Sequence, residues 1–302
     1  MLVTNPDFPV GNGACMCKTT GDVKSLAVSA ADFIVVGGYT PKERAGNPGN
    51  TFNGDSAQGL NSRGLPCGGI PYLDAHGKEM VETAHKAGKK IILNINGFTP
   101  RDYYDLTIAA VAAGFDGVEV NTACPNIVDG AARKPIFFFD LALSHHLIGA
   151  VSSALPEHMF MLVKVSVSSD PEYIVRYAQM LQPFGVYGVV ATNTFANCLL
   201  YRSDRKPQID TPDKTGWAGG SGHMLKAIAL GQVNQWRHTL PKATQVIGAG
   251  GVACHPSGIS YGFDVMDMLH AGASAVQVST AYAIHGPKIF GEIASQYLDQ
   301  LN

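Results

Sequence analysis

The sequence predicts an α/β protein, and we expect a (β/α)8 barrel of the TIM type with long loops at the carboxyl-terminal face of its strands. Short runs rich in Val, Ile and Ala alternate with longer segments of helical periodicity, as in βα units around a parallel sheet. Several helical segments end in Ala-Gly before the next apolar run, as at Ala87-Gly88 and Ala113-Gly114. Doubly wound folds show the same alternation, but the length fits one barrel of about 250 to 300 residues. We therefore expect a single domain over residues 1–302.

Seven strands can be assigned from apolar runs, and we expect an eighth in the stretch before Asn12. In chain order the seven lie at residues 33–36, 91–95, 117–120, 161–165, 188–191, 245–247 and 275–278. Helices are predicted at residues 78–87, 101–113, 141–154, 171–181, 226–237 and 262–271. Three long insertions, residues 37–72, 124–140 and 193–222, each follow the end of a strand at which barrel enzymes carry their active sites. Loops of that length are usually functional or disordered, and their Asn, Cys, Gly and Pro motifs favour function.

Composition excludes several classes of partner. The formal net charge is −2 and no block of Lys and Arg occurs, so we expect neither nucleic acid nor an anionic membrane as a partner. No run approaches the roughly 20 apolar residues that cross a bilayer. The start of the chain, Met1 to Pro9, has no basic segment followed by an apolar run. We therefore expect a cytoplasmic protein that acts on a small molecule.

The cysteines are scattered and form no CxxC pair. This spacing argues against a disulfide framework and against a structural zinc site, and we expect no metal. In a reducing compartment most of them would be small buried hydrophobic residues. The six are Cys15, Cys17, Cys67, Cys124, Cys198 and Cys254.

The strongest motif is Asn121-Thr-Ala-Cys124-Pro-Asn126, directly after the strand at residues 117–120. Two side-chain amides flank a thiol, which offers hydrogen bonds to a flat polar ligand and a group that can take a proton. The alternative is a buried thiol beside two asparagines that shape a turn.

The last two predicted strands are each followed by a turn, one with two glycines and one with two hydroxyl residues. Gly250 and Gly251 follow one, and Ser279 and Thr280 follow the next. In barrels these two loops commonly bind a phosphate, and glycine lets the backbone approach it closely. Gly222, at the end of the third insertion, could add backbone donors or could belong to a hinge. Lys164 lies inside an apolar strand and needs an anionic or electron-rich partner, either a cofactor or a carboxylate of the barrel.

These motifs occur in the order found in the dihydroorotate dehydrogenases, and the chain resembles that family from about residue 11 to residue 301. Residues 44–48 and 60–66 resemble its first active-site loop, residues 121–126 its catalytic motif, and Thr192-Asn193-Thr194 its second amide pair. The resemblance implies an FMN-dependent oxidoreductase that oxidises dihydroorotate to orotate in pyrimidine biosynthesis. Cys124 would be the general base, and a cysteine there marks the cytosolic class 1. A homodimer is implied too, with fumarate or a partner subunit as electron acceptor.

The resemblance also assigns the binding residues. The residues implied for the substrate are Asn61, Gly64, Leu65, Asn121, Asn126, Asn193 and Thr194. The residues implied for FMN are Gly13, Asn96, Asn121, Lys164, Gly222, Gly250, Gly251, Ser279 and Thr280.

Two departures from the family pattern bear on the substrate. Gly37-Gly38 stands where the family has Lys-Ser, which removes a charge-assisted hydrogen bond of about 1.5 to 3 kcal/mol. Asn94-Ile-Asn96 stands where relatives often carry serines. Another cyclic amide, lactam or enone is therefore an alternative substrate, and Lys18, Lys42 or Arg63 could replace the lost cation. A non-flavin, phosphate-binding barrel lyase or isomerase, with Lys164 as a Schiff-base nucleophile, is the alternative from another class.

Overall fold

The computed structural model describes residues 1–302 except 56, 125–127, 130–131, 254–260 and 302. Eight parallel strands form one sheet that curls into a nearly closed barrel. Along the sheet the strands are β1 (Val10–Asn12), β14 (Ala275–Val278), β13 (Gln245–Ala249), β10 (Gly188–Ala191), β9 (Phe160–Lys164), β6 (Gly117–Asn121), β5 (Lys90–Ile95) and β2 (Phe33–Tyr39). The predicted barrel and its eighth, N-terminal strand are confirmed.

A side chain joins the two end strands of this sheet. The amide Nδ2 of Asn12 on β1 donates to the carbonyl of Val35 on β2 at 2.7 Å, and the Val35 N–H donates to Asn12 Oδ1 at 2.9 Å. The backbone N–H of Asp32 adds a bond to the Val10 carbonyl at 2.8 Å. Asn12 is fully buried, so its amide takes the place of ladder bonds at the seam of the barrel.

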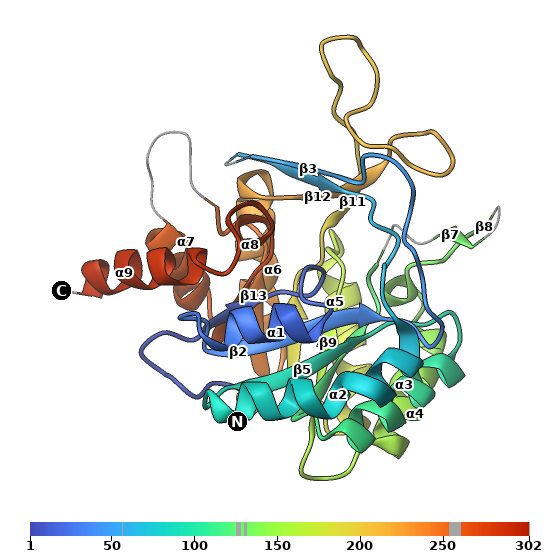
Figure 1. Cartoon of the computed structure of the whole chain (residues 1–302), viewed down its shortest axis with the longest axis vertical. Helices are drawn as coiled ribbons and strands as arrows, with labels where there is room; N and C mark the ends of the chain where they lie inside the picture. The colour runs from blue at the N-terminus through green and yellow to red at the C-terminus, as the bar shows by residue number, and fades with distance from the viewer. Residues whose placement is uncertain (56, 125–127, 130–131, 254–260, 302) are drawn as a thin grey trace.

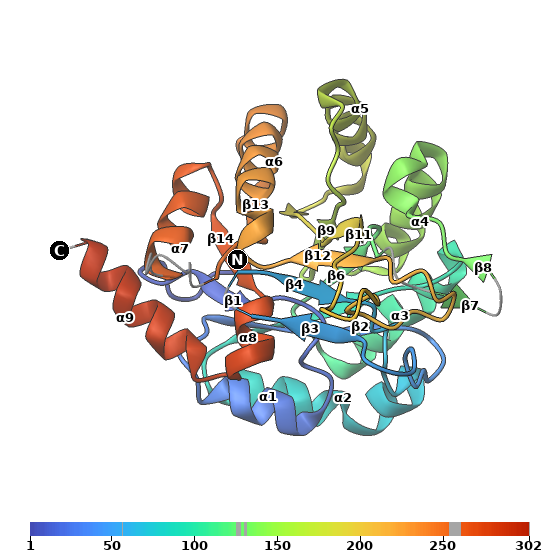
Figure 2. The ribbon, with the colours of Figure 1, turned by 90° about the horizontal axis from the view of Figure 1, so that it is seen from above.

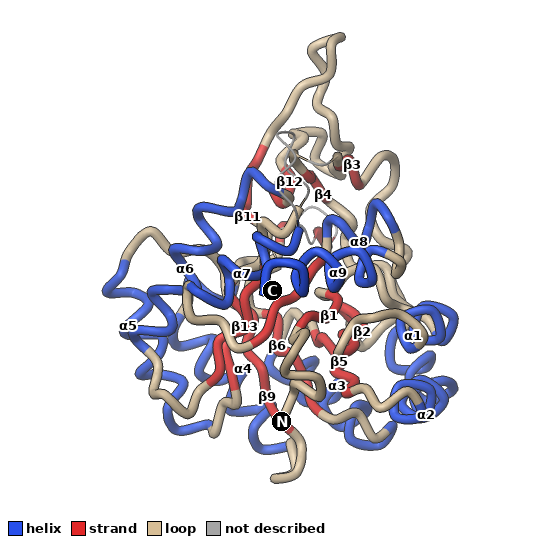
Figure 3. Tube along the Cα trace, turned by 90° about the vertical axis from the view of Figure 1, so that its left-hand side faces the viewer, coloured by secondary structure: helices blue, strands red, loops and turns tan. Residues whose placement is uncertain are grey.

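Helices surround the strands, as seen from above in Figure 2 and along the chain trace in Figure 3. They are α1 (Thr20–Ala27), α2 (Gly69–Lys86), α3 (Pro100–Ala113), α4 (Leu141–Ala154), α5 (Pro171–Leu181), α6 (Lys226–Thr239), α7 (Tyr261–His270), α8 (Thr280–His285) and α9 (Ile289–Leu301). Short 3-10 turns cover Phe137–Phe139, Gln182–Phe184 and His223–Leu225. Helices α4 and α5 have the predicted bounds, whereas α1, α8 and α9 were not predicted.

Helix α2 begins at Gly69, so the predicted start at residue 78 is wrong. Pro71 falls in its first turn, where proline is tolerated because the first N–H groups have no partner within the helix. Gly77 lies inside the helix against α3, and a Cβ there would come within 2.7 Å of the Ala113 Cβ. Pro71 therefore serves the start of the helix, and Gly77 serves its packing against α3.

The insertions contain strands of their own. Strands β3 (Phe52–Gly54), β4 (Gly59–Asn61), β11 (Phe195–Cys198) and β12 (Ala218–Ser221) form an antiparallel sheet from the first and third insertions, in the order β11-β12-β4-β3. This sheet lies above the barrel in Figure 1. Strands β7 (Val128–Asp129) and β8 (Ala132–Arg133) pair in the second insertion. Among the described residues, none of the helices is both long and apolar enough to span a membrane.

Candidate active site

A cavity lies between the carboxyl ends of the barrel strands and the antiparallel sheet. About 1110 Å³ of space free of protein atoms lies within it, part of which is open to solvent. Asn121, Lys164 and Gln277 line it from β6, β9 and β14, while Asn61 and Ser221 line it from β4 and β12. The insertions thus complete a pocket that the barrel opens at the expected face.

Most of the residues implied by the family resemblance line this cavity. They are Cys124, Asn61, Gly64, Leu65, Asn121, Asn193, Thr194, Lys164, Gly250, Gly251, Ser279 and Thr280. Gly13, Asn96 and Gly222 do not line it. Gly13 lies behind Ser279, where a Cβ would come within 2.1 Å of the serine Oγ. Asn126 and Cys254 fall outside the described residues.

Hydrogen bonds fix the amides beside Cys124. Asn193 Nδ2 donates to Asn121 Oδ1 at 3.0 Å, and the Ala123 N–H donates to the same oxygen at 3.1 Å. Asn193 Oδ1 in turn accepts the Thr194 N–H at 2.8 Å. Each amide therefore has a defined orientation, and the half-buried Cys124 shares the cavity with them. The group can hydrogen-bond a planar polar ligand next to a thiol.

The glycine turn that lines the cavity has a backbone without side chains, as a phosphate site favours. Gly250 and Gly251 have φ of +104° and +86°, a region that side chains disfavour. A Cβ on Gly251 would lie 2.4 Å from the Lys226 Cα, so the backbone stays bare on this side. Thr280 Oγ1 donates to Ser221 Oγ at 2.8 Å and links this end to the antiparallel sheet. These residues fit the phosphate of a nucleotide cofactor such as FMN.

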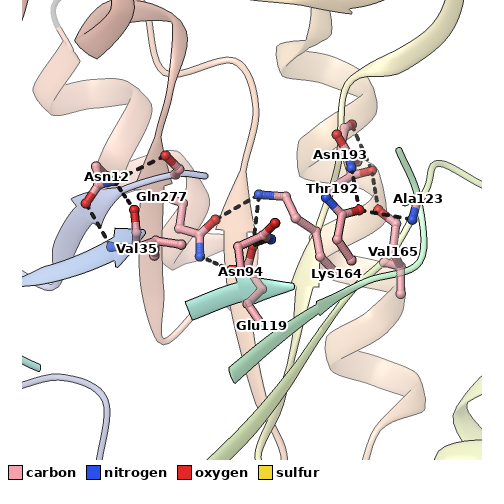
Figure 4. A network of polar contacts seen from close by, with 12 residues as sticks. Asn12, Val35, Asn94, Glu119, Ala123, Lys164, Val165, Thr192, Asn193 and Gln277 are labelled. Atoms are coloured by element: carbon pink, nitrogen blue, oxygen red, sulfur yellow. Dashed lines mark hydrogen bonds and ion pairs between the residues drawn. The ribbon is translucent and has the colours of Figure 1, made fainter. Parts of the chain in front are cut away.

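A network of buried polar groups forms the floor of the cavity (Figure 4). Lys164 Nζ donates to Gln277 Oε1 at 3.0 Å and lies 3.4 Å from Glu119 Oε1. Gln277 Nε2 and Asn94 Nδ2 also donate to the Glu119 carboxylate, at 2.5 and 2.6 Å. The barrel carboxylate expected as one possible partner of Lys164 is therefore present.

Glu119 is a residue that the sequence interpretation missed. It lies in β6, in which every residue is buried, and its own exposed fraction is 0%. A buried carboxylate must be paired to be tolerated. A single acidic residue inside an apolar strand therefore indicated a buried polar partner as clearly as Lys164 did.

The two departures from the family pattern fit each other in space. A Cβ on Gly38 would lie 2.2 Å from Asn96 Nδ2 and 2.8 Å from Asn94 Oδ1. Asn96 donates to Asn94 at 2.9 Å, and both amides are fully buried. Gly37 has a φ of +126°, and a Cβ there would meet the Asn94 carbonyl oxygen at 2.5 Å. The asparagines occupy the space that side chains at Gly37 and Gly38 would need.

Three cations were considered as substitutes for the lost lysine, and they differ in whether they line the cavity. Lys18 and Arg63 line the cavity, whereas Lys42 does not. Lys18 Nζ donates to the carbonyl of Gly38 at 2.8 Å, so its charge lies at the glycine pair itself.

Lys134, which sequence analysis did not single out, is buried in the second insertion. Its exposed fraction is 6%, and its Nζ has no hydrogen-bond partner within the described part of the chain. The ammonium lies 4.0 Å from the centre of the Phe137 ring. Burial lowers the pKa of Lys134 to about 8, although the neighbouring Cys124 and Asp102 act in the opposite direction.

Comparison with known proteins shows which family this chain matches. A sequence model of the dihydroorotate dehydrogenase family matches residues 4–301. The protein named probable dihydroorotate dehydrogenase A (fumarate) from Enterococcus faecalis is 29% identical over 285 residues, which cover 93% of this chain and 85% of the relative. The dihydroorotate dehydrogenase A (fumarate) of Lactococcus lactis is 28% identical over 282 residues, with coverage of 93% and 86%.

The fold has a counterpart among solved structures. The crystal structure of DHODH from Eimeria tenella in complex with ferulenol matches with a TM-score of 0.78 at 20% sequence identity. The match covers 97% of this chain and 81% of the other chain. At this identity the similarity concerns the barrel fold.

Proposed function

The chain belongs to the dihydroorotate dehydrogenase family, and on that basis we propose that it oxidises dihydroorotate to orotate with bound FMN and with Cys124 as the general base. As a member of this family it is an oxidoreductase that acts on a CH–CH bond. The alternative of a barrel lyase or isomerase is therefore wrong.

One observation carries the proposal: Cys124 shares a cavity with three asparagines and with the glycine turn at Gly250 and Gly251. Asn61, Asn121 and Asn193 line the same space as the thiol. Amides that hold each other in fixed orientations, as Asn121 and Asn193 do, can bind the edges of a planar cyclic amide with little loss of entropy.

In the proposed reaction, the Cys124 sulfur takes a proton from one substrate carbon while a hydride leaves the neighbouring carbon. FMN, when bound, supplies the hydride acceptor. The phosphate would lie at Gly250 and Gly251, and Lys164 would contact the flavin ring. The antiparallel sheet covers the cavity and would limit the access of water during the proton transfer.

We also propose fumarate as the electron acceptor, because the similar proteins from Enterococcus faecalis and Lactococcus lactis carry fumarate in their names. A partner subunit is the alternative acceptor. A homodimer in the cytoplasm is the assembly and location that we propose for the chain.

A second candidate is a related enzyme for another small cyclic amide, lactam or enone. The observation that favours it is the pair Gly37-Gly38, at which the expected lysine is absent and two buried asparagines fill the space. A changed pocket wall is what a changed ligand would require.

Anaerobic mixing of the purified yellow protein with dihydroorotate tests the proposal. We expect the flavin absorbance to bleach, and Cys124→Ala to slow bleaching by roughly 10²- to 10⁴-fold, the usual contribution of a general base. Cys198→Ser, a cysteine that does not line the cavity, is the matched control. A yellow protein that stays oxidised with dihydroorotate contradicts the substrate, and a protein that binds no FMN contradicts the cofactor.

A further inference from the structure

Besides Lys164, which is paired with Glu119, two cations line the described part of the cavity. Lys18 and Arg63 both face it, and none of its described lining residues is Asp or Glu. We propose that Lys18 and Arg63 form an anion subsite that binds the carboxylate of the substrate and selects anionic over neutral ligands. The identity of the anion rests on the proposed function, whereas the subsite itself does not.

The chain holds Lys18 at three points. Its backbone N–H donates to Asp22 Oδ2 at 2.8 Å, and its carbonyl accepts the hydroxyl of the buried Tyr39 at 2.5 Å. Its Nζ donates to the Gly38 carbonyl at 2.8 Å. An ammonium has three N–H donors, so this bond leaves donors for a ligand. Lys18 is thus a fixed cation.

Arg63 is the second cation of the subsite and lines the same cavity. It follows β4, two residues after Asn61, and its carbonyl accepts the Asn47 N–H at 2.9 Å. Its Nη1 lies 2.7 Å from the thioether sulfur of Met16, a weak acceptor that leaves most of the five guanidinium donors for other groups. A guanidinium of this kind suits a bidentate carboxylate.

The charges themselves argue for an anionic ligand. Burial is the main cause that lowers the pKa of Lys18, and the positive charge of Arg63 acts in the same direction. The nearby carboxylate of Asp22 is already bonded to the backbone N–H groups of Lys18 and Thr19. An anion between the two cations would replace their repulsion with two attractions.

The position of the subsite indicates substrate rather than cofactor. Arg63 is adjacent in the chain to Gly64 and two residues from Asn61, and the family resemblance implies both of these for the substrate. The phosphate cradle is built by other segments, at Gly250 and Gly251. A phosphate of the cofactor is nevertheless the other source of the same charge, so the test must separate the two.

Calorimetric titration of the FMN-loaded protein with two matched pairs provides that test. Orotate is compared with orotamide, and benzoate with benzamide, because the second pair does not require recognition of orotate. We expect the wild type to favour both carboxylates, and Lys18→Met and Arg63→Met each to weaken carboxylate binding by roughly 10- to 100-fold. Amide binding and FMN affinity should stay unchanged. Lys42→Met, at a lysine that does not line the cavity, is the control.

Each other outcome has a defined meaning. A wild type without carboxylate preference in either pair, or variants that retain it, overturns the subsite. A fall in FMN affinity with carboxylate preference intact assigns the cations to the cofactor phosphate and also overturns it. If orotate fails to bind but benzoate shows the preference and its dependence on Lys18, the subsite stands and dihydroorotate is the wrong substrate. Should Lys18→Met not fold, Arg63→Met decides.

Discussion

At the scale of single residues, Lys134 is a buried lysine whose pKa is lowered by its burial. With its pKa lowered to about 8 in the folded protein, the unfolded chain binds more protons between pH 8 and about 10.4. The group therefore costs stability below pH 8 and costs less as the pH rises through this window. We expect Lys134→Met to stabilise the protein at pH 7 by on the order of 2 kcal/mol, with a smaller gain at pH 10, as measured by urea unfolding.

The exposed Lys242 is the matched control for this prediction. Lys242→Met should change stability little and by a similar amount at both pH values. A Lys134→Met protein that is less stable at pH 7, or whose gain is the same at pH 10, would show that the burial of this ammonium carries no penalty.

The glycine pair at the cavity wall allows a second residue-scale prediction. Gly38→Ala would place a Cβ 2.2 Å from Asn96 Nδ2, and overpacking of this kind costs about 1 to 3 kcal/mol. Asn96→Ala removes the obstructing amide, so the double variant should be more stable than the sum of the single changes predicts. Thermal unfolding of the four proteins measures the coupling, and strictly additive effects would contradict the steric explanation.

For the same reason, Gly37→Lys cannot simply restore the family's lysine. The backbone at Gly37 has a positive φ, and a Cβ there meets a backbone carbonyl oxygen rather than a flexible side chain. The family resemblance places a lysine at position 37, whereas in this protein Lys18 Nζ donates to the carbonyl of the adjacent Gly38.

At the scale of elements, the close packing of α2 against α3 explains why Gly77 stands inside a helix. Alanine is about 1 kcal/mol better than glycine inside a helix, yet at Gly77 a Cβ would lie 2.7 Å from the Ala113 Cβ. We expect Gly77→Ala to destabilise the protein and Gly231→Ala, in α6 with no atom within 4 Å of the added Cβ, to stabilise it by about 1 kcal/mol.

Equilibrium denaturation of the two variants in parallel measures this opposite pair of effects. Ala113→Gly should partly rescue Gly77→Ala, because it removes the opposing methyl group. Stabilisation by both alanines would mean that the two helices adjust their spacing freely.

At the scale of the whole molecule, Asn12 closes the barrel. Replacement by Ala leaves the buried N–H and carbonyl of Val35 without their partners, and each unsatisfied group costs about 1 to 3 kcal/mol. We expect Asn12→Ala to lower the free energy of unfolding by about 2 to 4 kcal/mol, measured in guanidinium chloride. Asn53→Ala, an exposed asparagine on β3, should have little effect. An equal loss of unfolding free energy in both variants would show that the hydrogen bonds between β1 and β2 are not the cause.

The sequence by itself determined the barrel, most strand positions and the motif residues that line the cavity. These follow from local signals, because apolar runs, Ala-Gly helix ends and Asn or Gly clusters are contiguous in the chain. Even the bounds of α4 and α5 followed from such signals. The predicted start of α2 was wrong, because the helix begins at Gly69 and includes Gly77, which packs against Ala113 of another helix.

Only the tertiary structure decided which distant groups meet. Glu119 with Lys164 and Gly38 with Asn96 come from separate βα units, as do Lys18 and Arg63, which share the cavity, and their distance along the chain carries no information about proximity. The antiparallel sheet that roofs the cavity likewise joins strands from two insertions more than a hundred residues apart. Pairing across a barrel depends on strand register and side-chain packing, which a local pattern does not encode.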